Sequence, residues 1–227
     1  MKKLILAAAL SLGALTSQAQ LLTSVQNAFV DPGWSLLWNP NGALGDPSTY
    51  QALTDVGTPT APFYSAVPGN PEYLFANYQS QSPYVGVIGG LPGPGYNMGS
   101  GGIFSVIFGY TLTSSAVIEL QNSLLANIYN SDDGIKIWVF VNDETTARKE
   151  AASSFGQGST ATFNVNLGQL QAGDTFYVAV SPQGNNFADV FALQYDVVAV
   201  PEPATYGLLL VAGGLILWRR RASMSKV

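Results

Sequence analysis

The sequence predicts an all-β protein whose main part is an antiparallel β-sandwich, and three observations lead to this fold class. Only 10% of the 227 residues are charged, and glycine, proline and aromatic residues are frequent, a composition that favours strands and turns over helices. Apolar and polar residues alternate in several short runs of the second half. Turn sequences that contain Gly, Asp or Asn separate these runs.

The alternating runs predict strands with one buried and one solvated face. The clearest run places four large side chains on the same face: Phe191, Leu193, Tyr195 and Val197. Similar runs cover residues 116–121, 162–167 and 175–181. Short strands separated by turns are typical of a sandwich, and the jelly roll is the arrangement that this spacing favours.

The other elements are less regular. Strands are predicted at residues 33–39 and 135–142, and one or two helical turns at residues 143–153, because Glu144 and Arg148 lie four residues apart. Residues 20–102 are irregular and rich in loops, since prolines and glycines interrupt them. About 180 residues between the terminal segments are enough for one domain that buries roughly 70% of its unfolded surface.

The amino-terminal segment has the features of a signal peptide. Lys2 and Lys3 precede the apolar residues 4–15, and the small residues Ser17 and Ala19 provide a site for signal peptidase. We therefore predict a helical signal peptide at residues 1–19, with cleavage between Ala19 and Gln20. The alternative is an uncleaved helix that stays in the membrane. In both cases the following domain, residues 20–199, is exported.

The carboxyl-terminal segment combines three features in a fixed order. Val200, Pro201, Glu202 and Pro203 come first, an apolar stretch predicts a transmembrane helix at residues 204–218, and Arg219, Arg220 and Arg221 follow. Such a basic cluster stays on the cytoplasmic side of a membrane, which leaves residues 222–227 as a cytoplasmic tail. The most apolar part, residues 206–218, is only about 20 Å long as a helix, whereas the hydrocarbon core is about 30 Å thick.

This order of features resembles the PEP-CTERM sorting signal of Gram-negative bacteria that make extracellular polysaccharide, and the resemblance covers residues 200–221. It implies that an exosortase-type membrane enzyme reads the signal and that the anchor is removed near the Pro-Glu-Pro motif. The domain then passes to the cell surface or into the extracellular polymer. A permanent C-terminal membrane anchor is the alternative, because charge and hydropathy alone give the same pattern.

The charge of the exported domain differs from that of the whole chain. Without both terminal signals, three basic and thirteen acidic residues remain, a net charge of −10. We therefore expect no nucleic acid partner, because binding it requires a basic surface. The chain contains no cysteine and no histidine, which excludes thiol nucleophiles, Ser-His-Asp triads and histidine-ligated metals. The functions that remain possible are binding and catalysis by carboxylates.

A second resemblance concerns the exported domain. The domain resembles sandwich domains, related to carbohydrate-binding modules, that often precede this sorting signal. The resemblance rests on residues 109–112, 133–135, 138–142, 173–175 and 182–186. It implies the fold and no individual site residue. From the residues themselves, Trp138 and Phe140 share one face of a predicted strand, and they would form an aromatic platform on which a sugar ring stacks. Core packing of both rings is the alternative.

Acidic turns offer a second candidate site. Asp132 and Asp133 are adjacent in a predicted turn, and hard cations such as calcium take oxygen ligands of this kind. Further oxygen-bearing residues lie in neighbouring turns: Asp143, Asn185, Asn186 and Asp189. The alternative is that these residues only form the turns, and no other cofactor is expected.

Catalysis is not indicated by the spacing of the carboxylates. A glycosidase needs two of them about 5 to 10 Å apart in a cleft, and no pair stands out from the sequence. The sequence thus predicts an exported, non-enzymatic protein of the cell surface or extracellular matrix. Its expected partners are signal peptidase, an exosortase-type enzyme, the membrane and an extracellular polysaccharide. A structural matrix protein without a specific ligand and a carboxylate-dependent glycan hydrolase remain open.

Overall fold

The structure, a computed structural model, describes residues 19–42, 44, 46–58, 62–66, 74–78, 87–92, 104–128, 134–143, 149–154, 158–183 and 189–201. Within this part the only helices are two single turns of 3-10 type, η1 (Val25–Asn27) and η2 (Pro47–Thr49). The first seven strands have five residues or fewer: β1 (Gln20–Ser24), β2 (Trp34–Trp38), β3 (Gln51–Ala52), β4 (Thr54–Asp55), β5 (Phe63–Ser65), β6 (Phe75–Tyr78) and β7 (Ile88–Leu91). The later strands include longer ones: β8 (Val106–Thr111), β9 (Ala116–Asn127), β10 (Ile135–Val141), β11 (Lys149–Ser154), β12 (Thr160–Ala161), β13 (Val165–Leu170), β14 (Thr175–Pro182) and β15 (Phe191–Val200).

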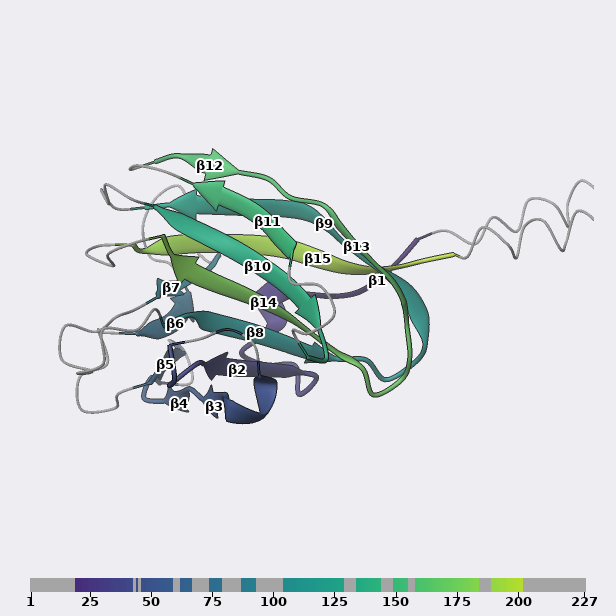
Figure 1. Ribbon diagram of the computed structural model, residues 1–227, viewed down its shortest axis with the longest axis horizontal. Coiled ribbons are helices and arrows are strands. Elements are labelled where there is room, and N and C mark those ends of the chain that lie inside the picture. Colours follow the sequence, from purple (N-terminus) through teal and green to yellow (C-terminus); the bar gives the residue numbers. More distant parts are fainter. Residues whose placement is uncertain are drawn as a thin grey trace, which may run out of the picture.

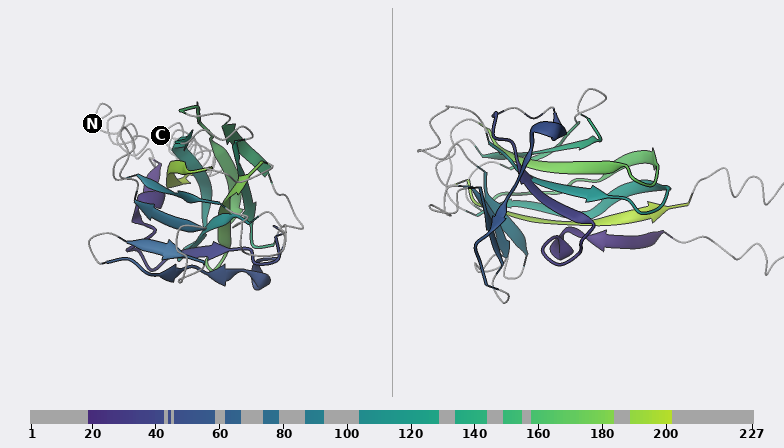
Figure 2. Two further views of the ribbon diagram at one scale, coloured as in Figure 1. Left: turned by 90° about the vertical axis from the view of Figure 1, so that its left-hand side faces the viewer. Right: turned by 90° about the horizontal axis from the view of Figure 1, so that it is seen from below.

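The strands form two sheets that pack face to face (Figures 1 and 2). The six-stranded sheet has the order β11-β10-β14-β8-β2-β3. The nine-stranded sheet has the order β12-β9-β15-β7-β6-β5-β4, with β1 paired to β15 and β13 paired to β9. The strand pairs of both sheets are antiparallel. The prediction of an all-β, antiparallel fold is confirmed for the described residues.

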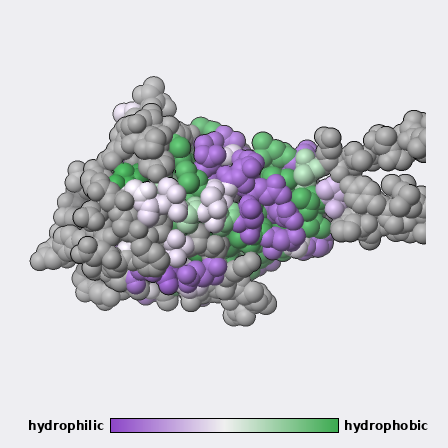
Figure 3. All heavy atoms as spheres, turned by 90° about the horizontal axis from the view of Figure 1, so that it is seen from above, coloured by the Kyte–Doolittle hydropathy of each residue, from purple (hydrophilic) through white to green (hydrophobic). Residues whose placement is uncertain are grey.

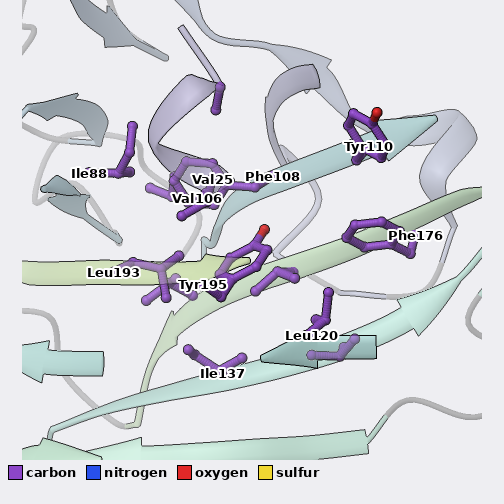
Figure 4. Packing of buried hydrophobic residues seen from close by; sticks show 14 of the residues in the cluster. Val25, Ile88, Val106, Phe108, Tyr110, Leu120, Ile137, Phe176, Leu193 and Tyr195 are labelled. Atoms are coloured by element: carbon purple, nitrogen blue, oxygen red, sulfur yellow. The ribbon is translucent and has the colours of Figure 1, made fainter. Parts of the chain in front are cut away.

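The core lies between the two sheets and is formed by the inward side of each alternating strand. The nine-stranded sheet contributes Leu120, Leu193 and Tyr195, and the six-stranded sheet contributes Phe108 and Phe176 (Figure 4). All five side chains are completely buried. Because the chain has no cysteine, the stability of the domain depends on this apolar burial, which contributes about 25 cal/mol for each Å² removed from water.

Tyr195 brings a polar atom into the middle of this core. Its ring centroid lies 6.0 Å from that of Trp34 and 5.9 Å from that of Phe163. The Tyr195 hydroxyl has no hydrogen-bond partner among the described residues. Burial raises the pKa of this hydroxyl well above its ordinary value, so it stays protonated. A buried hydroxyl without a partner costs free energy instead of stabilising the fold.

We therefore expect Tyr195→Phe to raise the free energy of unfolding by about 1 kcal/mol, because it removes an unsatisfied hydroxyl and leaves the ring in place. Urea denaturation followed by circular dichroism measures this change. A clear loss of stability would contradict the prediction, since it would mean that the hydroxyl is satisfied in the folded protein.

Two sequence-based predictions of secondary structure are wrong. Residues 149–154 form strand β11 and not helical turns, because their backbone pairs with β10, where Trp138 faces Glu150. The prediction for residues 144–148 lies outside the described part. Residues 162–164 are not strand, because both backbone polar groups of Phe163 hydrogen-bond to the Ser123 side chain. Strand β13 consequently starts at Val165.

The two ends of the described chain lie side by side. Gln20, the first residue of β1, pairs with Ala199 of β15, and Val200 is the last residue of β15. The described residues include both sides of the predicted cleavage site, Ala19 and Gln20, and the start of the sorting signal, Val200 and Pro201. Three predicted parts lie outside the described residues: the signal helix, the transmembrane helix at residues 204–218 and the rest of the sorting signal. Among the residues that the structure describes, no helix is long and apolar enough to cross a membrane.

Candidate functional site

The outer face of the six-stranded sheet carries an apolar stripe. Four outward-facing residues lie in one row across neighbouring strands, in the order Trp138, Ala179, Ile107 and Leu37. They pack with the neighbouring Phe140 and Tyr177 in a hydrophobic cluster that is separate from the core between the sheets. Leu44 and Tyr50 also pack against this cluster, and Ile107 and Ala179 are completely buried, so the part of the stripe that reaches solvent includes Trp138.

Three aromatic rings form the next row of this face. The rings of Phe140 and Tyr177 stack with centroids 5.1 Å apart and an angle of 23° between their planes. Tyr50, from the segment that follows η2, packs edge-on against both, at 6.5 Å from Phe140 and 6.0 Å from Tyr177. Gly109 leaves room for this cluster, because a Cβ at that position would lie only 3.0 Å from the Tyr177 ring.

The structure changes the role expected for Phe140. Only 1% of this residue is exposed, because Tyr50 and Tyr177 cover it. Phe140 cannot offer its ring to a sugar and instead stacks on the Tyr177 ring. Trp138 and Tyr177 remain partly exposed on the same face. Tyr50 and Tyr177 are the aromatic residues of this face that the sequence reasoning missed, although Tyr177 falls on the polar side of an alternating run.

A pair of opposite charges lies beside Trp138. The Lys136 ammonium is 6.0 Å from the centre of the Trp138 ring and 3.3 Å from Oε2 of Glu150. Both charged side chains are substantially exposed, so the ion pair contributes little to stability. It does place hydrogen-bond donors and acceptors next to a partly exposed aromatic ring.

Polar rows border the apolar stripe on both sides. On one side the hydroxyls of Ser105 and Ser181 are 2.6 Å apart, and the Ser105 amide donates to Oδ1 of Asn39. On the other side the hydroxyls of Thr111 and Thr175 are 2.9 Å apart. Asn39, Ser105 and Ser181 are buried and hold the strands together, whereas the Thr111–Thr175 pair is exposed on the surface.

The turn at the end of β13 adds a pH-sensitive contact to this side of the sheet. The Asp174 carboxylate accepts hydrogen bonds from the Gln171 amide at 2.7 Å and from Nδ2 of Asn142 at 3.0 Å. The bond from the Gln171 amide, followed by that from Asn142, lowers the pKa of Asp174.

From this pKa we expect a defined contribution to the acid sensitivity of the domain. The folded pKa of Asp174 lies below its unfolded value of about 3.9, so its stabilising contribution is present above about pH 4 and is lost as the pH falls through the folded value. Asp174→Asn should therefore flatten the acid side of a plot of denaturation midpoint against pH. A variant whose midpoint depends on pH in the same way as that of the wild type would contradict this.

A groove of about 350 Å³ lies at the edge of β2, between the residues after η1 and the β3–β5 region. It includes Phe29 and Tyr64, whose rings stack on each other at 5.2 Å. Its carboxylate, Asp31, accepts hydrogen bonds from the Gly33 amide and the Thr23 hydroxyl. The rings of Phe29 and Tyr64 and the Asp31 carboxylate therefore already make contacts within the folded protein.

The outer face of the nine-stranded sheet combines polar contacts with a small apolar cluster formed by Ala126, Ile128 and Ala192. Glu119 accepts hydrogen bonds from Gln121 at 2.7 Å and from Asn166 at 2.8 Å, and Asn122 donates to Asp196 at 2.8 Å. Figure 3 shows the molecule from above relative to Figure 1, and hydrophilic residues form a band across the described surface in that view. The two outer faces therefore differ in chemistry, with carboxylates and amides on one and aromatic rings on the other.

The proposed calcium ligands are not tested by the structure. Asp132, Asp133, Asn185 and Asn186 lie outside the described residues. Asp143 is exposed and Asp189 is completely buried. Within the described part, no three acidic residues come together in a way that would hold a metal ion. A calcium site at Asp132 and Asp133 therefore stays a prediction, which a comparison of melting temperatures with added calcium and with chelator would test.

Comparisons with known proteins support the sorting signal most directly. The profile of the PEP-CTERM protein-sorting motif matches residues 199–221. No curated protein matches the chain. Among solved structures, the chain is similar to a carbohydrate-binding module studied for specific mannan recognition, with 11% identity, a TM-score of 0.39 and coverage of 82% of this chain and 100% of that one. A likeness of this extent is no basis for transferring a ligand.

The match to the sorting motif bears out the resemblance drawn from the residues. Val200 is the last residue of strand β15, and Val200 and Pro201 both belong to the matched motif. The motif implies export, C-terminal membrane anchoring before sorting and processing by an exosortase-type enzyme. The chain therefore carries a PEP-CTERM protein-sorting motif that begins at the last two residues of the final strand of a β-sandwich domain.

Proposed function

We propose that this chain is an exported, non-enzymatic protein that binds polysaccharide of the extracellular polymer through the outer face of its six-stranded sheet. Export begins with a signal peptide that is cleaved between Ala19 and Gln20, and the domain, whose strand order we propose to be of jelly-roll type, then reaches the cell surface or matrix. One observation carries the proposal: a partly exposed Trp138 lies in an apolar stripe on an outer sheet face, beside the Lys136–Glu150 ion pair.

The chemistry of this face suits a sugar chain. Pyranose rings have apolar C–H faces that stack on aromatic rings, and their hydroxyl groups need donors and acceptors at the edge of the stack. Trp138 supplies such a ring, and Lys136 and Glu150 supply charged hydrogen-bonding groups next to it. All three residues come from paired strands of one sheet, so the site is held rigidly.

Two of the described carboxylates, those of Glu119 and Asp196, are bound by neighbouring amide side chains. Glu119 and Asp196 lie on the opposite outer face, and each accepts a hydrogen bond from an amide side chain. A general acid must hold a proton near neutral pH, for which burial in an apolar environment is the usual cause. Glu119 and Asp196 are partly exposed, and Asp189 is the completely buried carboxylate of the described part.

Affinity gel electrophoresis in the presence of cellulose derivatives, xylan, mannan or alginate tests this function. We expect at least one polysaccharide to retard the exported protein, and Trp138→Ala to weaken the interaction about tenfold or more, as truncation of a central aromatic residue usually does. Trp138→Phe should keep part of the retardation, because it preserves a ring. Absence of retardation by every polysaccharide, or equal retardation of wild type and Trp138→Ala, would contradict the proposal.

A further inference from the structure

The start and the end of the folded domain leave it at the same place. Strand β1 begins where β15 ends, with Gln20 opposite Ala199 and Leu21 opposite Val198. Figure 1 shows the start of β1 and the end of β15 at one end of the sandwich, whereas β4 lies toward the opposite end. We call the end formed by Gln20–Leu22, Ala116–Val117 and Val198–Val200 the terminal end.

The sequence leaves little chain between the terminal end and the membrane anchor. Five residues, 201–205, separate Val200 from the apolar run at residues 206–218. Fully extended, five residues span at most about 18 Å. The polar headgroup region alone takes up roughly 5 to 8 Å on each side of the hydrocarbon core. While the anchor is in place, the terminal end must therefore lie at or close to the lipid surface.

The side chains of the terminal end fit such a position. Leu21 is 59% exposed, and it is one of the three large hydrophobic residues exposed in the described part. Val117 and Val200, which face each other across β9 and β15, are half-buried. None of the residues that define the terminal end is charged, and the acidic residues near it include Asp174 in the turn that bonds to Ser115 and Glu202 in the linker.

We propose that the terminal end is a lipid-contacting surface, which rests on the headgroup region of the membrane that holds the anchor. An uncharged end with an exposed leucine can approach an anionic bilayer, where an acidic surface would be repelled. The sandwich then stands end-on, so that the Trp138 face stays exposed to the surrounding polymer during sorting. This inference depends on the membrane anchoring that the sorting motif implies, and it is independent of the proposed polysaccharide binding.

Site-specific fluorescence in vesicles tests the orientation. Because the chain has no cysteine, Leu21→Cys and Val56→Cys each give one labelling site for an environment-sensitive dye. Val56 is the matched control, since it is an exposed apolar residue, 38% exposed, directly after β4. The processed chain, which begins at Gln20 and keeps the carboxyl-terminal anchor, is reconstituted into vesicles of phosphatidylethanolamine and phosphatidylglycerol that contain a spin-labelled lipid with its quencher near the headgroup.

The two labels should respond differently. We expect the dye at position 21 to shift its emission to the blue and to lose most of its intensity when the spin-labelled lipid is present, while the dye at position 56 changes little. Flotation of both variants with the vesicles shows that the anchor is inserted. Equal quenching at both positions, stronger quenching at position 56, or failure of the chain to float would overturn the proposal. Failure of polysaccharide binding alone would leave it intact.

Discussion

Phe176→Ala is expected to lower the free energy of unfolding by about 3 to 5 kcal/mol, the usual range for removing a buried phenylalanine. Phe176 is completely buried between the sheets, with ring centroids 5.8 Å from Tyr110 and 6.3 Å from Trp34. The substitution leaves a cavity among large, rigid rings that cannot easily close over it. Since domains of this size are stable by only about 5 to 15 kcal/mol, much of the margin would be lost.

Urea denaturation of the exported protein, followed by tryptophan fluorescence, measures this effect. Phe63→Ala is a matched control, because Phe63 lies half-buried in the three-residue strand β5, where its ring stacks on Phe75 at 4.8 Å. We expect the control to cost clearly less than Phe176→Ala, because less apolar surface is lost from the interior. Equal losses for both variants would mean that the core between the sheets does not carry the stability.

Gly90→Ala is expected to destabilise the fold by about 3 kcal/mol or more, at the upper end of the cost of overpacking. Gly90 lies in β7, where it pairs with Ala76 of β6 and with Phe191 of β15. An added Cβ would overlap the backbone oxygen of Phe75 and approach the Phe191 ring to 3.0 Å. A backbone oxygen within a sheet cannot move away as the end of a side chain can, so the pairing of β6 and β7 would be lost.

Gly158→Ala separates this steric effect from the general cost of replacing a glycine. Gly158 has a φ of +73° and no atom within 4 Å of an added Cβ, so its replacement costs only the backbone strain of about 1 to 2 kcal/mol. Thermal denaturation should therefore show a much larger loss for Gly90→Ala. A smaller loss for Gly90→Ala than for Gly158→Ala would contradict the close packing of β7 against β6.

The alternating strands of the second half could be predicted from the sequence because each buries one face. Phe191, Leu193, Tyr195 and Val197 all lie in the core, as the period of two requires. The first half was predicted to be irregular, and its strands β3, β4 and β5 have only two or three residues. Such short strands depend on pairing with distant neighbours and carry no periodic signal of their own.

The limits of prediction at the candidate site have a physical cause. Period-two reasoning correctly placed Trp138 and Phe140 on one face, but it could not show that Tyr50 folds over Phe140. That contact joins segments far apart in the chain, and only the tertiary fold brings them together. The same applies to β11, because its strand structure at residues 149–154 depends on pairing with β10 and not on a local pattern.

The central claim is that polysaccharide binds on the outer face of the six-stranded sheet, and variants of the two opposite faces test it most directly. Titration calorimetry with the retarding polysaccharide gives the Kd of wild type, Trp138→Ala and Gln194→Ala. Gln194 lies half-buried on β15, with its side chain on the outer face of the nine-stranded sheet. We predict that Trp138→Ala raises the Kd about tenfold or more, and that Gln194→Ala leaves it within about twofold of the wild type. An unchanged Kd for Trp138→Ala, or a larger increase for Gln194→Ala, would contradict the claim.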